Sequence, residues 1–186
     1  MPKAIHVSCL FSIRSLSLWL LLASWFLGSS YAQDKYAYAY VCAKGKIHFF
    51  SATSLEDIEA TSHEALCVFN TNSKKIYAKM RQVSFLFKDK LMQDRFNENY
   101  MESERFPFDI LDMTLVDELD FTRDGSYELT LKRTLYLYGT KKERETKGKI
   151  IIMNGQPVQA SSEFMVNLAD YNIEIPSILA QILMKT

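Results

Sequence analysis

Alternation of apolar and polar residues is the dominant pattern along this chain. Over residues 126–138 nearly every other residue is apolar, and most residues between them are polar. Because successive side chains of a β-strand point to opposite faces, this pattern predicts a long strand with one buried face. Residues 164–168 alternate in the same way. The apolar phase switches between Met80 and Val83, which indicates a bulge or a sharp bend near residues 81–82.

Turn sequences divide the pattern into short strands joined by hairpins. Asp124-Gly125 and Asn154-Gly155 are typical of tight hairpin turns. Residues 139–148 are predicted to be either a longer hairpin loop or two strand ends. We expect strands near residues 36–50, 65–69, 75–87, 108–119, 126–138, 148–153 and 157–168. These strands make an antiparallel sheet, which must close into a barrel or fold into a sandwich.

Two short helices interrupt this all-β pattern. Ser54 and Asp57 form a capping-box-like start for a helix that ends near Thr61. A second helix is predicted over residues 89–103, with Asp89 as its N-cap and its apolar residues on one face. That face is expected to pack on the sheet, as a plug or as a lid over the mouth of a cavity.

The N-terminal region is typical of an export signal. Basic residues Lys3 and Arg14 precede a largely apolar stretch of twelve residues at 16–27, and the small residues Ser30 and Ala32 follow. We predict a secretory signal peptide over residues 1–32, cleaved after Ala32, and one mature domain over residues 33–186 in the periplasm or outside the cell. An uncleaved anchor is the alternative, but twelve residues are too few to cross a bilayer core of about 30 Å.

Charge and cysteine content narrow the function further. The chain has 22 basic and 22 acidic residues, so it lacks the basic excess of a nucleic-acid-binding protein. Its 48% apolar content excludes intrinsic disorder. The mature chain retains Cys42 and Cys67, which permits one disulfide in an oxidising compartment. Two buried free thiols fit the same sequence equally well.

No pattern of catalytic or metal-ligating residues emerges. After the signal peptide the chain has two histidines, His48 and His63, and neither has a second histidine or a cysteine at ligand spacing. A nucleophile elbow and a phosphate-binding glycine loop are both missing from the sequence. We therefore expect no enzyme activity, no catalytic residue, no metal and no cofactor. Convergence of His48 with two or more carboxylates in one cleft would instead indicate an enzyme.

Several tracts, in the same order, resemble the YceI-like family, and most closely its branch common in Bacteroidetes. The most specific is Leu-Met-Gln-Asp-Arg-Phe-Asn-Glu-Asn-Tyr-Met-Glu-Ser at residues 91–103, which Phe-Leu-Phe precedes and Phe106-Pro107 follows. Residues 55–60, the tract Leu-Tyr-Leu-Tyr-Gly at 135–139 and residues 164–176 are also similar to it. The resemblance covers about residues 46–178.

This resemblance implies an eight-stranded, antiparallel, lipocalin-like barrel that is exported to the periplasm. Members of the family bind polyisoprenoids or other long amphiphilic lipids in an elongated apolar cavity, so the expected ligand is an isoprenoid-type lipid or a quinone. The alternative for each candidate residue is ordinary core packing. The candidate ligand-binding residues are Phe85, Phe87, Leu91, Met92, Phe96, Tyr127, Leu129, Leu131, Leu135, Leu137, Phe164, Val166 and Leu168.

Two departures from the family pattern affect these expectations. Tyr138 occupies the place of a family histidine, so no role of that histidine is transferred. The family continues into a final strand after the position of Pro176, and our count here is seven strands, which predicts a groove with open edges in place of a closed tube. The principal hypothesis is a periplasmic lipid carrier. The alternative is an envelope protein-interaction module with a filled, ligand-free barrel whose open edge accepts a partner strand.

Overall fold

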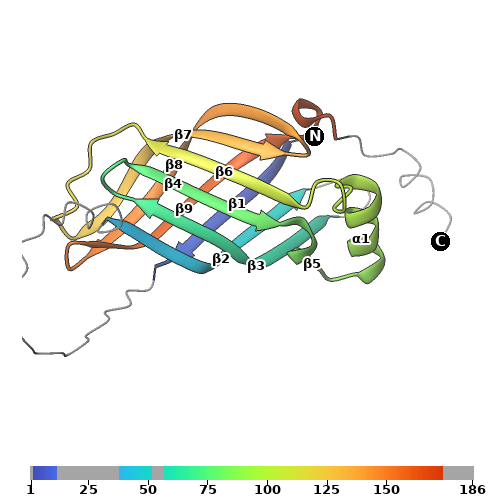
Figure 1. Cartoon of the computed structure of the whole chain (residues 1–186), viewed down its shortest axis with the longest axis horizontal. Coiled ribbons are helices and arrows are strands. Elements are labelled where there is room, and N and C mark those ends of the chain that lie inside the picture. Colours follow the sequence, from blue (N-terminus) through green and yellow to red (C-terminus); the bar gives the residue numbers. More distant parts are fainter. Residues whose placement is uncertain (1, 12–37, 52–56, 174–186) are drawn as a thin grey trace, which may run out of the picture.

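The protein folds as an antiparallel β-barrel, seen in a computed structural model that describes residues 2–11, 38–51 and 57–173 (Figure 1). The all-β, lipocalin-like fold class predicted from the sequence is confirmed. The helical segments are η1 (Gln82–Ser84), α1 (Lys90–Arg95), η2 (Phe96–Tyr100) and η3 (Leu168–Tyr171). The strands are β1 (Pro2–Leu10), β2 (Ala39–Ser51), β3 (Ile58–Asn70), β4 (Lys75–Arg81), β5 (Leu86–Phe87), β6 (Phe108–Leu115), β7 (Gly125–Leu137), β8 (Thr140–Met153) and β9 (Gln156–Asn167).

Eight of the strands in the described residues form a closed ring. The order is β2-β1-β9-β8-β7-β6-β4-β3, and β3 pairs again with β2. The two-residue strand β5 pairs with Ala60 and Thr61 of β3, on the same edge of β3 that β4 pairs with at residues 66–70. Closure gives each strand of the ring two hydrogen-bonded neighbours, which removes the free edges of an open sheet. Helix α1 lies at one end of the barrel (Figure 1).

The strand that closes the ring comes from the N-terminus of the chain. β1 runs antiparallel to β9 from Pro2, opposite Asn167, to Leu10, and antiparallel to β2 from Ala4, opposite Phe50, to Ser8. Our expectation of seven strands and an open groove is therefore wrong. The sequence reasoning missed β1 because it assigned these residues to an export signal.

Cleavage after Ala32 stays a prediction, but it has a structural consequence. The uncut chain uses residues 2–10 as part of the barrel, so the barrel described here is not confined to residues 33–186. A chain cut after Ala32 would lack β1, and β2 and β9 would each lose the neighbour that it provides. The apolar stretch at 16–27 lies outside the described residues.

Within the described part of the chain, no helix combines the length and the apolar character that crossing a bilayer requires.

The two predicted helices have different outcomes. α1 and the π-helical turn η2 form the second one, and Asp89 caps it by accepting a hydrogen bond from the backbone nitrogen of Met92 at 2.8 Å. The first helix is wrong from residue 58 onward, because β3 begins at Ile58; residues 52–56 lie outside the described residues. Pairing of Ala60 with Phe49 on β2 buries Ala60, and this tertiary contact outweighs the local capping signal.

The strand boundaries follow the predicted phases with two refinements. The bend expected near residues 81–82 is confirmed, because β4 ends at Arg81 and the 3₁₀ turn η1 follows. Of the two alternatives for residues 139–148, strand ends are correct. β7 and β8 meet in a tight turn at Tyr138 and Gly139, whose φ angles are +50° and +69°.

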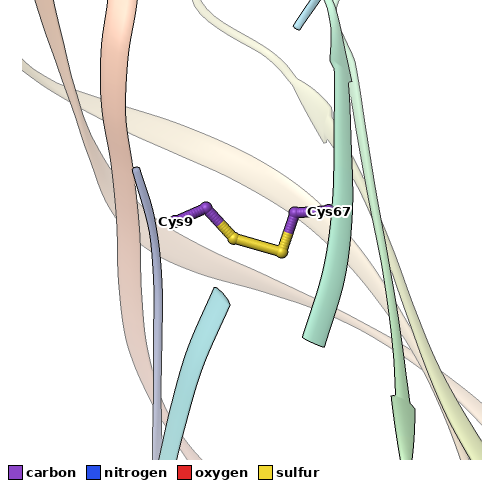
Figure 2. Close-up of a disulfide and its surroundings, with 2 residues drawn as sticks. All are labelled: Cys9 and Cys67. Atoms are coloured by element: carbon purple, nitrogen blue, oxygen red, sulfur yellow. A yellow bond between two sulfur atoms is a disulfide. The ribbon is translucent and has the colours of Figure 1, made fainter. Parts of the chain in front are cut away.

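A disulfide joins Cys9 of β1 to Cys67 of β3 across the intervening strand β2 (Figure 2). Of the two alternatives for Cys42 and Cys67, the disulfide between them is therefore wrong. Cys42 is a buried free thiol, as the other alternative expected, but Cys67 is bonded to Cys9. Gly45 of β2 makes the bridge possible, because a Cβ atom there would lie 2.8 Å from the Cys9 sulfur and 2.9 Å from the Cys67 sulfur. The sequence reasoning did not consider Cys9, because it lay in the segment assigned to the signal peptide.

Because β1 closes the barrel, a charge on its inward face should destabilise the fold, whereas a charge on its outward face should not. Val7 is buried in the interior, whereas Ser8 belongs to the opposite face of the strand. In the uncut chain, expressed without export, Val7→Asp should lower the free energy of unfolding by roughly 3 kcal/mol because it buries an unpaired carboxylate. The matched variant Ser8→Asp should change it by less than about 0.5 kcal/mol. Urea denaturation measures both, and equal stabilities for Val7→Asp and the wild type would show that β1 does not close the barrel.

The disulfide predicts a specific peptide map. Digestion of the uncut protein without reductant should release Cys9 and Cys67 in one cross-linked fragment, identified by mass spectrometry, and Cys42 as a free thiol. Cys9→Ser should lower the free energy of unfolding by about 4 kcal/mol in the chain-entropy treatment of a loop of 58 residues. A fragment that links Cys42 to Cys67 would contradict this pairing.

Candidate functional site

An apolar pocket lies at the end of the barrel that α1 and η2 cover. Side chains from β1, β2, β6, β7 and β9 form its walls, and Met92, Phe96 and Tyr100 reach it from the helical segment. The space between the lining atoms is about 930 Å³, including the open solvent at the mouth. The cavity within it has a volume of about 80 Å³. The pocket is therefore several times larger than a single-water cavity.

The other half of the barrel is filled by side chains. Phe69, Ile150 and Ile152 are almost completely buried there, and the Cys9–Cys67 bridge crosses the interior. A second, smaller pocket beside the bridge leaves about 20 Å³ by the same measure. The expected cavity is thus present in one half of the barrel and does not run along its full length.

Phenylalanine rings join the helical segment to the pocket wall. Phe96 of η2 stacks on Phe49 of β2, with ring centroids 5.5 Å apart and an interplanar angle of 21°. It also contacts Phe87 at 4.8 Å and Phe85 at 6.1 Å. Aromatic pairs of this kind contribute about 0.5–1.5 kcal/mol each beyond their buried area. These contacts position η2 as a cover over the pocket, as the lid interpretation expected.

The structure brings most of the predicted ligand-binding residues into this pocket. Those that line it are Phe85, Phe87, Met92, Phe96, Leu135, Leu137, Phe164, Val166 and Leu168. Four others lie elsewhere. Leu91 is 56% exposed on α1, and Tyr127, Leu129 and Leu131 lie nearer the opposite end of β7. Alternation identifies the inward face of a strand, but it does not tell which end of the barrel a residue occupies. Contact with a ligand stays a prediction for all of them.

Sequence reasoning missed the larger part of the lining. Ile47 and Phe49 alternate with polar residues in β2, so the same signal could have found them. The lining residues of β1 were missed because they were assigned to the signal peptide. Nothing in the local sequence pattern indicates that Gln82 or Asp109 faces the pocket. The lining residues not predicted are Lys3, Ile5, Val7, Ile47, Phe49, Ile58, Met80, Gln82, Tyr100, Met101, Asp109, Leu111 and Ile173.

Two polar side chains form a buried pair in the pocket wall. The amide nitrogen of Gln82, in η1, donates a hydrogen bond to the Oδ2 atom of Asp109, on β6. Gln82 is 1% exposed and Asp109 is 4% exposed. Burial raises the pKa of Asp109 to about 8, although the hydrogen bond from Gln82 lowers it. The neutral carboxylic acid is therefore the main form of Asp109 at pH 7.

Lys3 is the basic residue of the pocket wall. Its Nζ atom lies 5.8 Å from the ring centroid of Phe49, within the range of a cation–π contact. Burial lowers the pKa of Lys3 to about 8, because an ammonium group loses hydration there.

The polar residues that sequence reasoning examined for chemistry lie outside the pocket. His48 alternates with the inward-facing Ile47 and Phe49, and its Nε2 atom lies 2.9 Å from Glu59 on the outer surface. The Nζ atom of Lys88 lies 3.2 Å from the same carboxylate. One carboxylate therefore contacts His48, on an open face. Over the residues that the structure describes, no three histidine, cysteine or acidic side chains group in a way that could hold a metal ion.

Tyr138, predicted to take the place of a histidine in the YceI-like pattern, has a structural role outside the pocket. Its hydroxyl donates a hydrogen bond to Glu102, and its ring packs on Phe106 with centroids 4.5 Å apart. Arg105 also contacts Glu102, at 3.2 Å. These hydrogen bonds lower the pKa of Glu102, that of Tyr138 being the larger cause. Tyr138 thereby ties the segment after η2 to the β7–β8 turn.

Comparison with solved structures shows the same fold in a known protein. A polyisoprenoid-binding domain from Saccharophagus degradans, implicated in plant cell wall breakdown, superimposes with a TM-score of 0.57. The match covers 78% of this chain and 83% of that one, at 12% sequence identity, so the likeness is one of fold. Comparison with protein-family models gives no match, and neither does comparison with curated protein sequences.

The raised pKa of Asp109 predicts a pH-dependent stability. An aspartate in the unfolded chain titrates near pH 4. Between there and pH 8, folding takes up a proton on Asp109, so the free energy of unfolding should fall as pH rises, by up to about 1.4 kcal/mol per pH unit. Asp109→Asn should remove this contribution. Urea denaturation between pH 5 and pH 7.5 measures how the free energy of unfolding changes with pH in the wild type and in Asp109→Asn. This range lies below the pKa of Lys3, so Lys3 contributes little. The same pH dependence in both proteins would contradict the burial of Asp109 as a neutral acid.

Proposed function

We propose that this protein binds an isoprenoid-type lipid, or a similar amphiphile, in the pocket beneath η2. The observation that supports this proposal most strongly is the lining of the pocket, which is apolar or aromatic apart from Lys3, Gln82 and Asp109. Burying hydrocarbon in such a site contributes about 0.8 kcal/mol per CH₂ group before ordering costs. The shared fold with a polyisoprenoid-binding domain supports this proposal.

The size of the pocket limits how much of the ligand it holds. Its open and enclosed space together are about 930 Å³, near the upper end of the range for small-molecule sites, and much of that is solvent at the mouth. The rest of the barrel interior is occupied by side chains. We propose that one end of the ligand lies inside the pocket and that the remainder of a long chain extends past η2.

The wider assignment is also a proposal. We propose a non-catalytic carrier or sequestering protein without a cofactor, exported to the periplasm or secreted, from the Bacteroidetes-type branch of the YceI-like family. The sequence tracts at residues 85–107 and 135–139 support the family, and the N-terminal pattern supports export. The alternative, a protein-interaction module, was motivated by an open sheet edge. In the uncut chain β1 pairs with both strands at that position, so no observation favours this alternative.

Organic extraction of the purified protein tests the function directly. We expect mass spectrometry of the extract to show an isoprenoid-type lipid in stoichiometric amount, or the delipidated protein to take up prenols or quinones. A protein that contains no lipid and takes up neither class would contradict the proposal.

Two adjacent helix residues provide a matched test of the pocket. Met92 lines it, whereas Leu91 faces solvent on the same helix. Met92→Arg places a charge against the buried chain and should weaken farnesol binding by about tenfold or more. Leu91→Arg adds the same charge outside the pocket and should change the affinity by less than about twofold. Isothermal titration of both delipidated variants measures this, and equal losses would place the binding site elsewhere.

A further inference from the structure

Three buried polar atoms in the pocket wall lack a hydrogen-bond partner among the described residues. They are the Oε1 atom of Gln82, the Oδ1 atom of Asp109 and the hydroxyl of Tyr100. All three residues line the same pocket, and all are at least nine-tenths buried. Buried polar groups in folded proteins nearly always have a partner, because leaving them unpaired forfeits their hydration. Three such atoms in one apolar pocket therefore indicate a ligand with a polar end.

The chemistry of these atoms specifies what that polar end must do. The nitrogen of the Gln82 side chain donates to Asp109, so the atom left without a partner is the amide oxygen, which carries no hydrogen and can only accept. Asp109 uses Oδ2 in that contact and is mainly protonated at neutral pH, which makes its free oxygen available for donation. The Tyr100 hydroxyl can both donate and accept. A matching group must donate to Gln82 and accept from Asp109 or Tyr100.

We propose that the pocket recognises the neutral hydroxyl end of an isoprenoid alcohol. The hydroxyl donates to Oε1 of Gln82 and accepts from Asp109 or Tyr100, while the first part of the chain lies among the phenylalanine rings and leucines of the pocket. This inference rests on the proposed function and adds to it the ligand class and the end of the ligand that the pocket holds.

Other polar ends satisfy the pocket less well. A quinone or aldehyde carbonyl can only accept, so it leaves the Gln82 oxygen without a partner. A carboxylate or phosphate places a charge beside that oxygen, in an apolar wall. Among the described residues of the lining, Lys3 is the one cationic side chain, and its Nζ atom lies over Phe49. An anionic ligand would need to reach Lys3 in place of the Gln82–Asp109 pair.

Four ligands with the same chain distinguish these possibilities. Delipidated protein is titrated calorimetrically with farnesol, farnesyl methyl ether, farnesal and farnesoic acid. Farnesol should bind about tenfold more tightly than each of the other three, because it alone both donates and accepts without carrying a charge. This comparison uses the wild-type protein, so it does not depend on the folding of any variant.

Variants then assign the preference to the named atoms. Gln82→Met should reduce the preference for farnesol over its methyl ether to less than about threefold, with the affinity for the ether nearly unchanged, because the ether has no hydrogen to donate to Gln82. Tyr100→Phe removes a donor that both ligands can use, so it should leave their ratio unchanged. Leu137→Ala, which removes apolar lining without a polar atom, is the control. It should weaken both ligands alike and preserve their ratio.

Each remaining outcome overturns the inference in a recognisable way. Equal binding of farnesol and its ether would exclude recognition of the hydroxyl but would leave lipid binding intact. Tighter binding of farnesoic acid would assign recognition to Lys3 and an anionic end. Binding of none of the four ligands would overturn both this inference and the proposed function.

Discussion

The pairing of β1 with β2 and β9 is the constraint on which the rest of the structure depends. A sheet of seven strands would leave the edges of β2 and β9 free, whereas β1 gives both of them a neighbour and closes the ring. The same strand supplies Lys3, Ile5 and Val7 to the pocket, so the strand that closes the barrel is also part of the pocket wall. Its Cys9 is bonded to β3, which ties the closing strand to the opposite side of β2.

Closure divides the interior into a filled half and a hollow half, and this division gives the pocket its chemistry. The disulfide and large aliphatic side chains fill the half away from α1. At the α1 end, the aromatic contacts of Phe96 cover a space that is apolar except at a few positions. The Gln82–Asp109 pair persists there because its members bond each other and burial keeps the acid neutral. The proposed binding of a neutral amphiphile rests on this apolar wall and its neutral polar pair; Lys3 is the basic residue of the described lining.

Alternation predicted most of the barrel because it reports directly on which side of a strand is buried. It located β7 and β9, and the phase switch located the turn after Arg81. It failed where another constraint dominates. The residues of β1 precede an apolar stretch that has the composition of an export signal, and β3 begins inside a segment with a helix-capping signal. Arg133 lies in the inward phase of β7 and is buried with its guanidinium 3.8 Å from the ring centroid of Phe164, an exception that no periodicity predicts. The buried polar pair of the pocket, Gln82 and Asp109, comes from η1 and β6, and only the fold brings its two members together.

Amide hydrogen exchange in β1 tests barrel closure most directly. In the uncut, oxidised protein, the backbone amides of Ile5, His6 and Val7 should exchange as slowly as those of their neighbours in β9, because they lie within a ladder bonded on both sides. Slow exchange in β1 together with slow exchange in β2 and β9 would establish the closed ring. Exchange of the β1 amides at the rate of an unstructured peptide, with β9 still protected, would contradict it.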